Sequence, residues 1–334
     1  MLKHGKHEGT RVFITGATGF VGGALARVLA WQGAEVHALA RANADRSALN
    51  DVPITWHEGD VTRPDSLNGE LAKATRIIHA AGRLGEAGVP ETTYRQINVE
   101  GTRNVLEAAL KAGSKTRVLH VSSAGVLGRT SREPATEERP YAPNNPYERS
   151  KVAAERVALD YAAKGLPVVV ARPGLIYGPG DHHVLKLFRA IRDERFFYIA
   201  GGQRLCHPTY IDDVVAGLLA CLDNGRLGET YHFTGPRPVT FRELAETIAL
   251  TLGVRRPWLN LPGWPVLAGA SCLEAVGRIA KWRPPLSRNG VDFFRADRVF
   301  SWRKAQAELD YTPAHDLATG IGLTVTWYQR NGLL

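Results

Sequence analysis

The feature that most constrains the fold of this chain is a regular alternation of short apolar runs with helical patterns over its first half. The apolar runs stand at residues 11–16, 35–41, 54–61, 75–82, 116–125 and 166–174, and the helical patterns at 20–33, 64–72, 91–112 and 147–164. Strands that are apolar throughout and separated by helices are typical of a parallel sheet covered on both faces. Because crossovers are right-handed, the pattern predicts an α/β fold with a doubly wound sheet whose ligand lies at the carboxyl ends of the strands.

A glycine-rich turn follows the first of these runs. The segment TGATGFVGG places three glycines between the first strand and the first helix. Without side chains, the backbone can turn tightly and approach a pyrophosphate, to which the helix N-terminus offers free N–H groups and its positive dipole end. The sequence therefore predicts a dinucleotide bound by Gly16, Thr18, Gly19, Phe20, Val21 and Gly22.

The end of the second strand bears on the choice of cofactor. An Asp or Glu at this place would accept a hydrogen bond from the ribose 2′-hydroxyl of NAD, but the chain has Arg41. An arginine can pair with a 2′-phosphate instead. Between NAD(H) and NADP(H), the sequence favours NADP(H).

Residues after the third and fourth strands fit the rest of the same dinucleotide. Asp60 and Val61 follow the third strand, where a carboxylate can accept a hydrogen bond from the adenine amino group. The small residues Ala80, Ala81 and Gly82 end the fourth strand and would let a cofactor lie flat. We expect all five to contact the cofactor.

The second half of the chain has a looser pattern. Helical patterns cover 182–197 and 209–224, a strand pattern covers 229–235, and the last hundred residues are mostly helical with proline breaks. We predict a Rossmann-type dinucleotide-binding domain at 11–178, to which 206–235 returns. A smaller, mainly helical substrate-binding lobe is predicted at 179–334, and a flexible polar leader at 1–10.

Composition excludes several classes of function. Lys and Arg exceed Asp and Glu by nine, which suits a phosphate-bearing ligand, but they are scattered, so nucleic-acid binding is not expected. The cysteines at 206, 221 and 272 lack metal-ligand spacing; we expect buried thiols, a cytoplasmic location and no metal site. His79 is expected to be a satisfied, partly buried histidine. No apolar run reaches about 20 residues, so no membrane span is expected.

The first turn of the predicted helix at 147–164 carries a phenol and an ammonium on one face. Tyr147 and Lys151 lie one helical turn apart. A phenol with a pKa near 10 is a poor base, but a nearby ammonium and the positive ring of an oxidised nicotinamide both favour the phenolate. Tyr147 is therefore a candidate acid/base for interconverting an alcohol and a ketone. Ser122 and Ser123, at the end of the fifth strand, supply a hydroxyl to polarise the substrate oxygen.

Together these segments resemble the extended short-chain dehydrogenase/reductases, the NAD-dependent epimerase/dehydratase group. The resemblance covers roughly residues 10 to 330 and rests on TGATGFVG (15–22), GDV (59–61), HAAG (79–82), NVEGT (98–102), VSSAGVLG (121–128), PYERSK (146–151) and RPGLIYGPGD (172–181). It implies that Ser123 is the catalytic serine, Tyr147 the acid/base and Lys151 its electrostatic partner. It also implies that Arg172 and Pro173 lie beside the nicotinamide.

The resemblance carries two further expectations. Asn98 would be mainly structural, and family members often dimerise through the helices that here span 91–112 and 147–164, which predicts a homodimer. Two departures concern the substrate. Leu127 stands where sugar-nucleotide epimerases usually have a tyrosine, and His207 stands near the place of an arginine that often contacts nucleotide phosphates, with Arg204 off the usual register.

An apolar, tryptophan-bearing stretch at 257–281 is similar to the corresponding region of 3β-hydroxysteroid and C4-sterol dehydrogenases and of hopanoid-associated members. An amphipathic core helix is the alternative interpretation. Glu274 and Arg278 argue against a membrane span, while an interfacial helix with peripheral membrane contact stays open. The residues expected to contact a small-molecule substrate are Leu84, Ser123, Leu175, Tyr177 and His207.

Three functions remain open at this point. The first is an NAD(P)-dependent oxidoreductase that interconverts a secondary alcohol and a ketone on a fairly apolar, sterol-like substrate. The second is a nucleotide-sugar epimerase or dehydratase with tightly bound NAD. The third is a non-catalytic dinucleotide sensor, against which the complete set of Ser123, Tyr147 and Lys151 argues.

Overall fold

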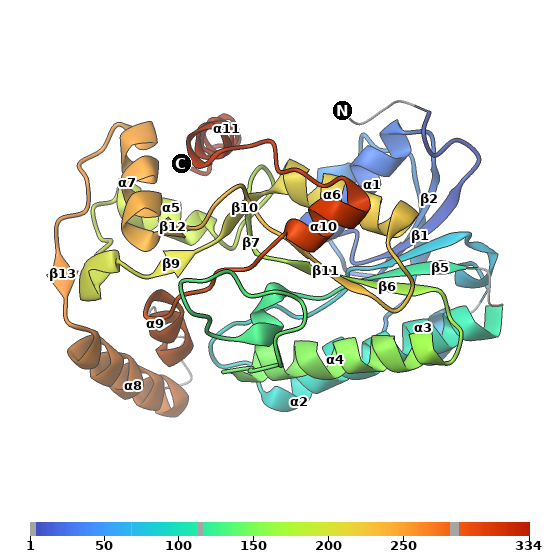
Figure 1. The fold of residues 1–334 in the computed structure, drawn as a ribbon, viewed down its shortest axis with the longest axis horizontal. Coiled ribbons are helices and arrows are strands. Elements are labelled where there is room, and N and C mark those ends of the chain that lie inside the picture. Colours follow the sequence, from blue (N-terminus) through green and yellow to red (C-terminus); the bar gives the residue numbers. More distant parts are fainter. Residues whose placement is uncertain (1–4, 68, 113–115, 281–286) are drawn as a thin grey trace.

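Parallel strands form the central sheet of the computed structural model, which describes residues 5–67, 69–112, 116–280 and 287–334 (Figure 1). Among the described residues the strand order is β11(Thr230–Phe233), β6(Val168–Pro173), β5(Arg117–Val121), β4(Arg76–His79), β1(Arg11–Thr15), β2(Glu35–Ala40) and β3(Ile54–Glu58). The order reverses between β1 and β4, and the carboxyl ends of these strands border the crevice where ligands of such sheets bind. The predicted Rossmann-type α/β fold is confirmed.

Two helical layers cover the sheet. The helices α1(Phe20–Trp31) and α6(Ile211–Asn224) lie on one face, and α3(Gly101–Ala112) and α4(Pro146–Ala163) on the other (Figure 1). Successive side chains of a strand point to opposite faces. Phe13 and Ile14, adjacent in β1, therefore belong to different hydrophobic clusters, one on each side of the sheet.

The C-terminal lobe lies beyond the edge of the sheet (Figure 1). It contains α5(Leu185–Arg192), α7(Phe241–Leu252), α8(Gly263–Ile279) and α9(Arg288–Phe294). Although α6 and β11 lie between these helices in sequence, they belong to the layers of the sheet. The last two helices of the chain are α10(Arg303–Leu309) and α11(Leu317–Arg330). Short pairs of strands connect its loops: β7(Leu175–Tyr177) with β10(Pro208–Tyr210), β8(Tyr198–Ile199) with β13(Asn260–Leu261), and β9(Leu205–Cys206) with β12(Val239–Thr240). The division into a cofactor domain and a substrate lobe stays a proposal.

Two predicted helices differ in the structure. In place of a helix over 64–72 there are 3₁₀ turns at Pro64–Leu67 and Leu71–Lys73, because Gly69 between them takes a left-handed conformation with φ +88°. The helix expected over 182–197 is only α5. The Asp181 carboxylate accepts hydrogen bonds from the backbone just before it, and Glu194 takes a positive φ just after it.

The helix predicted over 91–112 contains a π-helical turn. It begins as α2(Glu91–Tyr94), continues as a π-helical segment at Arg95–Glu100 and ends as α3. Asn98 lies in the π-helical turn. Its Oδ1 accepts a hydrogen bond from the backbone N–H of Arg83 (2.7 Å), and its Nδ2 donates to Ser150 Oγ (2.8 Å). Asn98 thus joins the loop after β4 to α4, which confirms the expected structural role.

The start of α4 is held from two directions. The Asn145 side chain caps the helix by accepting from the backbone N–H of Glu148 (2.9 Å), and Pro146 occupies its first turn. The buried Glu148 carboxylate also pairs with Arg298 (2.9 Å), a residue from the C-terminal part of the chain. Close by, Ala135 forms a β-bridge with Phe300.

The segment before β1 contacts the C-terminal end of α1. The predicted leader includes His7, which is buried and whose backbone N–H donates to Gln32 O (3.0 Å).

Cys206 and Cys221 are buried as predicted, but Cys272 is exposed, because α8 turns this side chain away from the lobe. Within the described part of the chain, no helix is long and apolar enough to cross a membrane.

Candidate active site

The turn between β1 and α1 is shaped for close approach of another molecule to its backbone. Gly16 has φ +83°, and a Cβ there would lie 2.6 Å from the backbone N of Ala81; a Cβ on Gly22 would lie 2.2 Å from Gly16 O. Both positions therefore exclude any side chain. Gly19 caps α1 without a side-chain hydrogen bond, which leaves the first N–H groups of the helix available to a phosphate. The turn fits a bound pyrophosphate.

The adenine-side residues also lie at the carboxyl edge of the sheet. Asp60 Oδ1 accepts hydrogen bonds from the backbone and hydroxyl of Thr62, and Val61 is buried against Gly101 of α3. Arg41 directly follows β2 and is exposed, and among the described residues no hydrogen bond or ion pair holds its side chain. Arg41 is therefore available to an anionic group at this edge.

Buried histidines support the strands beneath this edge. His79 bonds the hydroxyls of Thr15 (2.7 Å) and Thr102 (2.9 Å) through its two ring nitrogens, and burial lowers its pKa to about 3. This confirms the expected structural histidine. His120 of β5 lies beside it at 5.5 Å between ring centroids, and neither of its ring nitrogens has a hydrogen-bond partner in the described chain. Both rings are neutral and keep this layer uncharged beneath Lys151.

The structure brings the three predicted catalytic side chains together. Ser123 follows β5, and Tyr147 and Lys151 lie in the first turns of α4; the Ser123 side chain is near enough to Tyr147 to lower its pKa. Lys151 is buried, and its Nζ donates to the backbone carbonyl of Val121 (2.7 Å) at the end of β5. A phenol, a hydroxyl and an ammonium therefore meet at the carboxyl end of β5.

Burial sets the protonation of this group. It raises the pKa of Tyr147 to about 12, although the neighbouring Ser123 side chain acts in the opposite direction. It lowers the pKa of Lys151 to about 8, against the attraction of the Glu155 carboxylate. At neutral pH the protein alone therefore holds a neutral phenol beside a mostly charged ammonium. A positive charge above Tyr147 would be needed to bring its pKa towards neutrality.

A buried carboxylate one turn after Lys151 was not predicted as part of the site. Glu155 is fully buried and pairs with Arg172 of β6 (2.5 Å between Oε1 and Nη2). It also accepts hydrogen bonds from Ser122 Oγ (2.5 Å) and Tyr141 OH (2.8 Å). The spacing of four from Lys151 was visible in the sequence, but the partners come from a strand and a loop that only the fold brings close.

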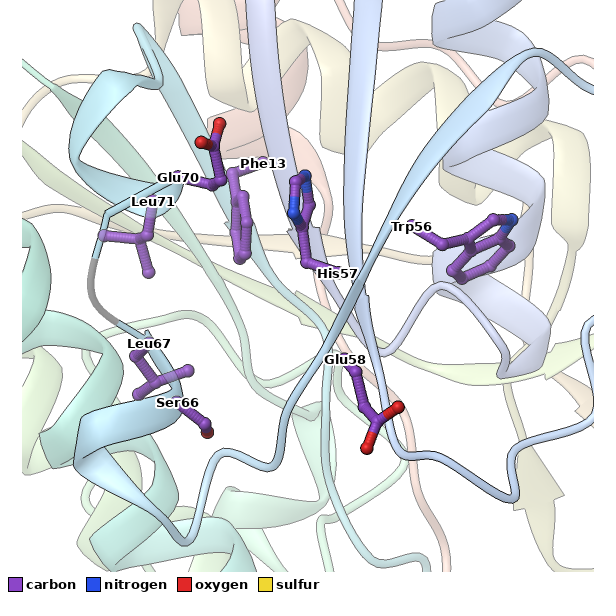
Figure 2. Close-up of a pocket in the computed structure, with 8 residues that line it drawn as sticks. All are labelled: Phe13, Trp56, His57, Glu58, Ser66, Leu67, Glu70 and Leu71. Atoms are coloured by element: carbon purple, nitrogen blue, oxygen red, sulfur yellow. The ribbon is translucent and has the colours of Figure 1, made fainter.

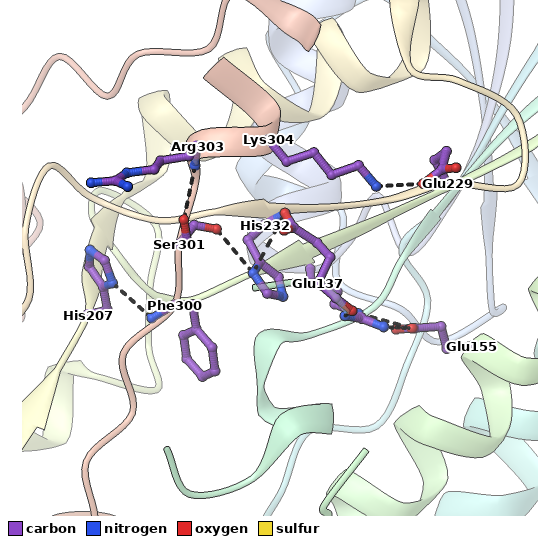
Figure 3. Close-up of polar contacts among 10 residues, drawn as sticks. Glu137, Glu155, His207, Glu229, His232, Phe300, Ser301, Arg303 and Lys304 are labelled. Atoms are coloured by element: carbon purple, nitrogen blue, oxygen red, sulfur yellow. Dashed lines mark hydrogen bonds and ion pairs between the residues drawn. The ribbon is translucent and has the colours of Figure 1, made fainter. Parts of the chain in front are cut away.

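Glu155 also determines where Arg172 points. The resemblance places Arg172 beside the nicotinamide, but its guanidinium lies against Glu155 and donates to the backbone carbonyl of Glu137 (3.2 Å). The Glu137 carboxylate in turn accepts a hydrogen bond from the backbone N–H of His232 (2.8 Å). The His232 ring contacts the backbone carbonyl of Ser301 (Figure 3). Arg172 therefore connects α4 to the C-terminal part of the chain.

The predicted substrate residues differ in their surroundings. Leu84 is 53% exposed in the loop after β4, and Leu175 is half-buried in β7. Tyr177 is buried against Gly320 of α11 and Tyr210. His207 is buried too: Nε2 contacts Gly235 O (2.9 Å) and Nδ1 accepts from the backbone N–H of Phe300 (3.4 Å), so neither nitrogen is free. Leu84 is the most accessible of these residues.

A separate pocket of about 280 Å³ lies between β3 and the turns that follow it; Figure 2 shows His57 and Glu70 among its lining residues. With His37, these two offer ligand atoms close enough for a metal ion. The Arg11 guanidinium, however, lies 2.5 Å from Glu70 and 3.5 Å from His37 Nδ1. A cation of the chain itself therefore already lies among these side chains.

Comparison with known proteins agrees with this geometry. The model of the "NAD dependent epimerase/dehydratase family" matches residues 12–233. The chain belongs to this family. A 4-hydroxy-2-methyl-3-oxo-4-farnesyl-3,4-dihydroquinoline-1-oxide ketoreductase of Stigmatella aurantiaca is 30% identical over 90% of this chain and 91% of its own length. Sterol demethylase protein B of Methylococcus capsulatus is 27% identical over 96% of this chain and 99% of its own length.

A solved structure supports the same assignment. DesIV of Streptomyces venezuelae, a dTDP-glucose 4,6-dehydratase with NAD bound, superposes with a TM-score of 0.78 at 28% identity, covering 96% of this chain and 98% of its own. This member of the epimerase/dehydratase family is therefore an NAD(P)-dependent enzyme of the extended short-chain dehydrogenase/reductase type. The glycine turn, which leaves no room for side chains, fits such a cofactor.

Proposed function

We propose that this enzyme interconverts a secondary alcohol and a ketone on a fairly apolar, sterol-like substrate. The grouping of Tyr147 with Ser123 at the end of β5, with buried Lys151 one helical turn away, carries the proposal. When bound, the nicotinamide cofactor supplies or accepts the hydride. In reduction, the Tyr147 hydroxyl gives its proton to the substrate oxygen while Ser123 donates a hydrogen bond to the same atom. In oxidation, the proton returns to Tyr147.

Lys151 assists this proton transfer. Its ammonium, held at the end of β5 by the Val121 carbonyl, favours the phenolate that remains after Tyr147 has given up its proton. Because burial alone raises the pKa of Tyr147, the phenol is a poor acid until positive charge adjoins it. We therefore propose that the pKa of Tyr147 comes near neutral pH only in the complex with oxidised cofactor.

Two observations support an apolar substrate. Leu84 is an exposed apolar side chain in the loop that covers Tyr147, where a Cβ on Gly85 would lie 3.3 Å from the Tyr147 ring. Relatives of the chain are named for farnesylated and sterol substrates. Arg204, the arginine nearest to the usual phosphate contact, is instead paired with Asp297 (3.1 Å).

Arg41 supports a preference for NADP(H), because it is exposed directly after β2, where the cofactor's ribose would lie, and no described residue pairs with it. The homodimer through 91–112 and 147–164 also stays a proposal, which rests on the family resemblance alone. For the domains, we propose a cofactor domain at 11–178, to which 206–235 returns, and a mainly substrate-binding lobe at 179–334.

The test is turnover of a hydrophobic ketone, followed by the nicotinamide absorbance. The turnover of Tyr147→Phe should fall by a factor of about 10²–10⁴, while the cofactor still binds, because the variant lacks only the proton donor. Tyr161→Phe, on the same helix but away from the site, is the matched control and should remain active. Full activity of Tyr147→Phe would remove the catalytic assignment.

A nucleotide-sugar epimerase or dehydratase is the second candidate, favoured by relatives and neighbours named dTDP-glucose 4,6-dehydratase. In that reaction the cofactor is oxidised and reduced within one turnover. Purified protein that carries tightly bound NAD and converts a nucleotide sugar without net change in absorbance would favour it over the reductase.

A further inference from the structure

The helix α8 lies at the far end of the C-terminal lobe (Figure 1). It is apolar on two opposite sides. On its inner side, Val266 and Ala270 are buried in a cluster with Ile199 and Val291. Its outer side consists of Trp264, Ala268, Cys272 and Val276, four residues apart in sequence and all exposed. A helix on a protein surface normally turns polar side chains outward. The outer side of α8 is therefore an apolar stripe with nothing packed on it in the described chain.

The segment just before α8 in the sequence is exposed and apolar too. Trp258 is 70% exposed and Leu259 38%, and on α8 itself Trp264 is 75% exposed and Val276 55%. Of the nine large hydrophobic side chains exposed in the described residues, these four fall within nineteen consecutive positions, 258–276. We call Trp258, Leu259 and the outer side of α8 the α8 surface. Exposed apolar side chains gathered in this way mark an interaction site.

Positive charge adjoins the α8 surface. Arg255 and Arg256 precede Trp258, and they line a shallow depression with Arg195 and Glu194 from the end of α5. The depression thus has three arginines for one carboxylate. Arg255 forms no ion pair with any residue that the structure describes, and Arg256 is 3.9 Å from Glu246 while 67% exposed. The charge of this surface is available to an anionic partner.

We propose that the α8 surface docks on an anionic lipid bilayer. Tryptophan is the side chain that favours the membrane–water interface, and a helix with an apolar outer stripe lies in the plane of that interface. Arginines beside the stripe face the negative headgroups. A second copy of the chain fits less well, because a two-fold contact would bring the same arginines close to one another.

This docking goes beyond the proposed function and does not depend on it. A chain that lies on the surface, held by one helix and a loop, needs no membrane-spanning segment. The interpretation of 257–281 as a core helix alone is incomplete, because one side of α8 packs inward while the other remains uncovered.

The test is sedimentation of the full chain with lipid vesicles. The wild type should bind phosphatidylcholine vesicles that contain phosphatidylglycerol and should bind pure phosphatidylcholine much more weakly. In the double variant Trp258→Ala/Trp264→Ala, the partition coefficient onto the anionic vesicles should fall at least about tenfold, because interfacial anchoring depends on these rings. Arg255→Gln/Arg256→Gln should bind less tightly at low salt and show a flatter salt dependence.

The matched control is Trp31→Ala, which removes an exposed tryptophan from α1 on the cofactor domain and should bind as the wild type does. Thermal unfolding of each variant checks its fold; all the replaced side chains are exposed. Quenching of tryptophan fluorescence by brominated lipid should be strong in the wild type and weak in the double variant. Absence of binding to anionic vesicles, or binding that the double variant retains, would overturn the proposal. So would a wild-type dimer that the double variant dissolves, since the α8 surface would then be a contact between copies.

Discussion

The buried pair of Glu155 and Arg172 should be the most sensitive polar contact behind the site. Both side chains are almost completely inaccessible, at 0% and 3% exposure. Glu155→Gln keeps the shape, but its single amide oxygen replaces the two carboxylate oxygens that accept from Ser122 and Tyr141, and the variant removes the charge opposite Arg172. Breaking one partner of a buried ion pair costs about 3–5 kcal/mol, because the remaining charge has no compensation. That is a large share of a typical folding free energy of about 5–15 kcal/mol.

A double-mutant cycle separates the pair from its surroundings. Arg172→Met removes the cation and keeps an apolar stem of similar length, and Glu155→Gln/Arg172→Met removes both charges. Because the double variant leaves neither charge of this pair without its partner, it should lose less stability than the sum of the losses of the two single variants. The difference should be about 2–3 kcal/mol, at the upper end for side chains in contact.

The assay is urea unfolding followed by circular dichroism, with linear extrapolation to water. Asp51→Asn is the matched control, since Asp51 also pairs with an arginine, Arg27, but at the surface, and its unfolding midpoint should hardly change. Two results would refute the view that Glu155 is held as a charged partner of Arg172. One is a loss of less than about 1 kcal/mol in the free energy of unfolding of Glu155→Gln, and the other is a double variant whose loss equals the sum of the two single losses.

Two further predictions concern the cofactor and acid stability. Arg41→Asp should weaken NADP(H) binding more than NAD(H) binding, measured by fluorescence titration; an equal effect on both would remove Arg41 from the 2′-phosphate site. Burial lowers the pKa of His79 and His232 to about 3 and of His207 to about 4, so between these values and about 6.5 the unfolded chain binds more protons than the folded one. Stability should therefore fall as the pH drops from 6.5, by up to about 1.4 kcal/mol per pH unit for each histidine. His79→Asn should flatten this slope in urea titrations at pH 6, 5 and 4, and an unchanged slope would contradict the neutral buried state.

The sequence predicted those parts of the molecule that depend on local pattern. The strands of the sheet, the glycine turn and the helix carrying Tyr147 follow from apolar periodicity, from the absence of side chains and from a cap with proline. The proximity of Tyr147 and Ser123 followed from strand order, since residues at the carboxyl ends of neighbouring elements meet at one edge.

Other parts depend on contacts between distant segments. The pairing of Glu155 with Arg172 needs β6 to pass beneath α4, and the two-residue strands β8, β9, β12 and β13 exist because tertiary packing brings their backbones together. His207 was expected at the substrate, but its ring bonds the backbone near 235 and 300, contacts that no local pattern shows. The 3₁₀ turns at 64–73 depend on the backbone conformation of Gly69, which helical periodicity alone does not indicate.

The ion pair between Glu148 and Arg298 limits how this protein can be divided. The family match ends at residue 233, where the last strand of the sheet is complete, and this would be a natural place to end an expressed fragment. Yet the cation that neutralises the first turn of α4, next to Tyr147, comes from residue 298. A fragment that ends after the sheet would leave the buried Glu148 carboxylate without its counterion, so the chain should be expressed, and exchanged between relatives, as one unit.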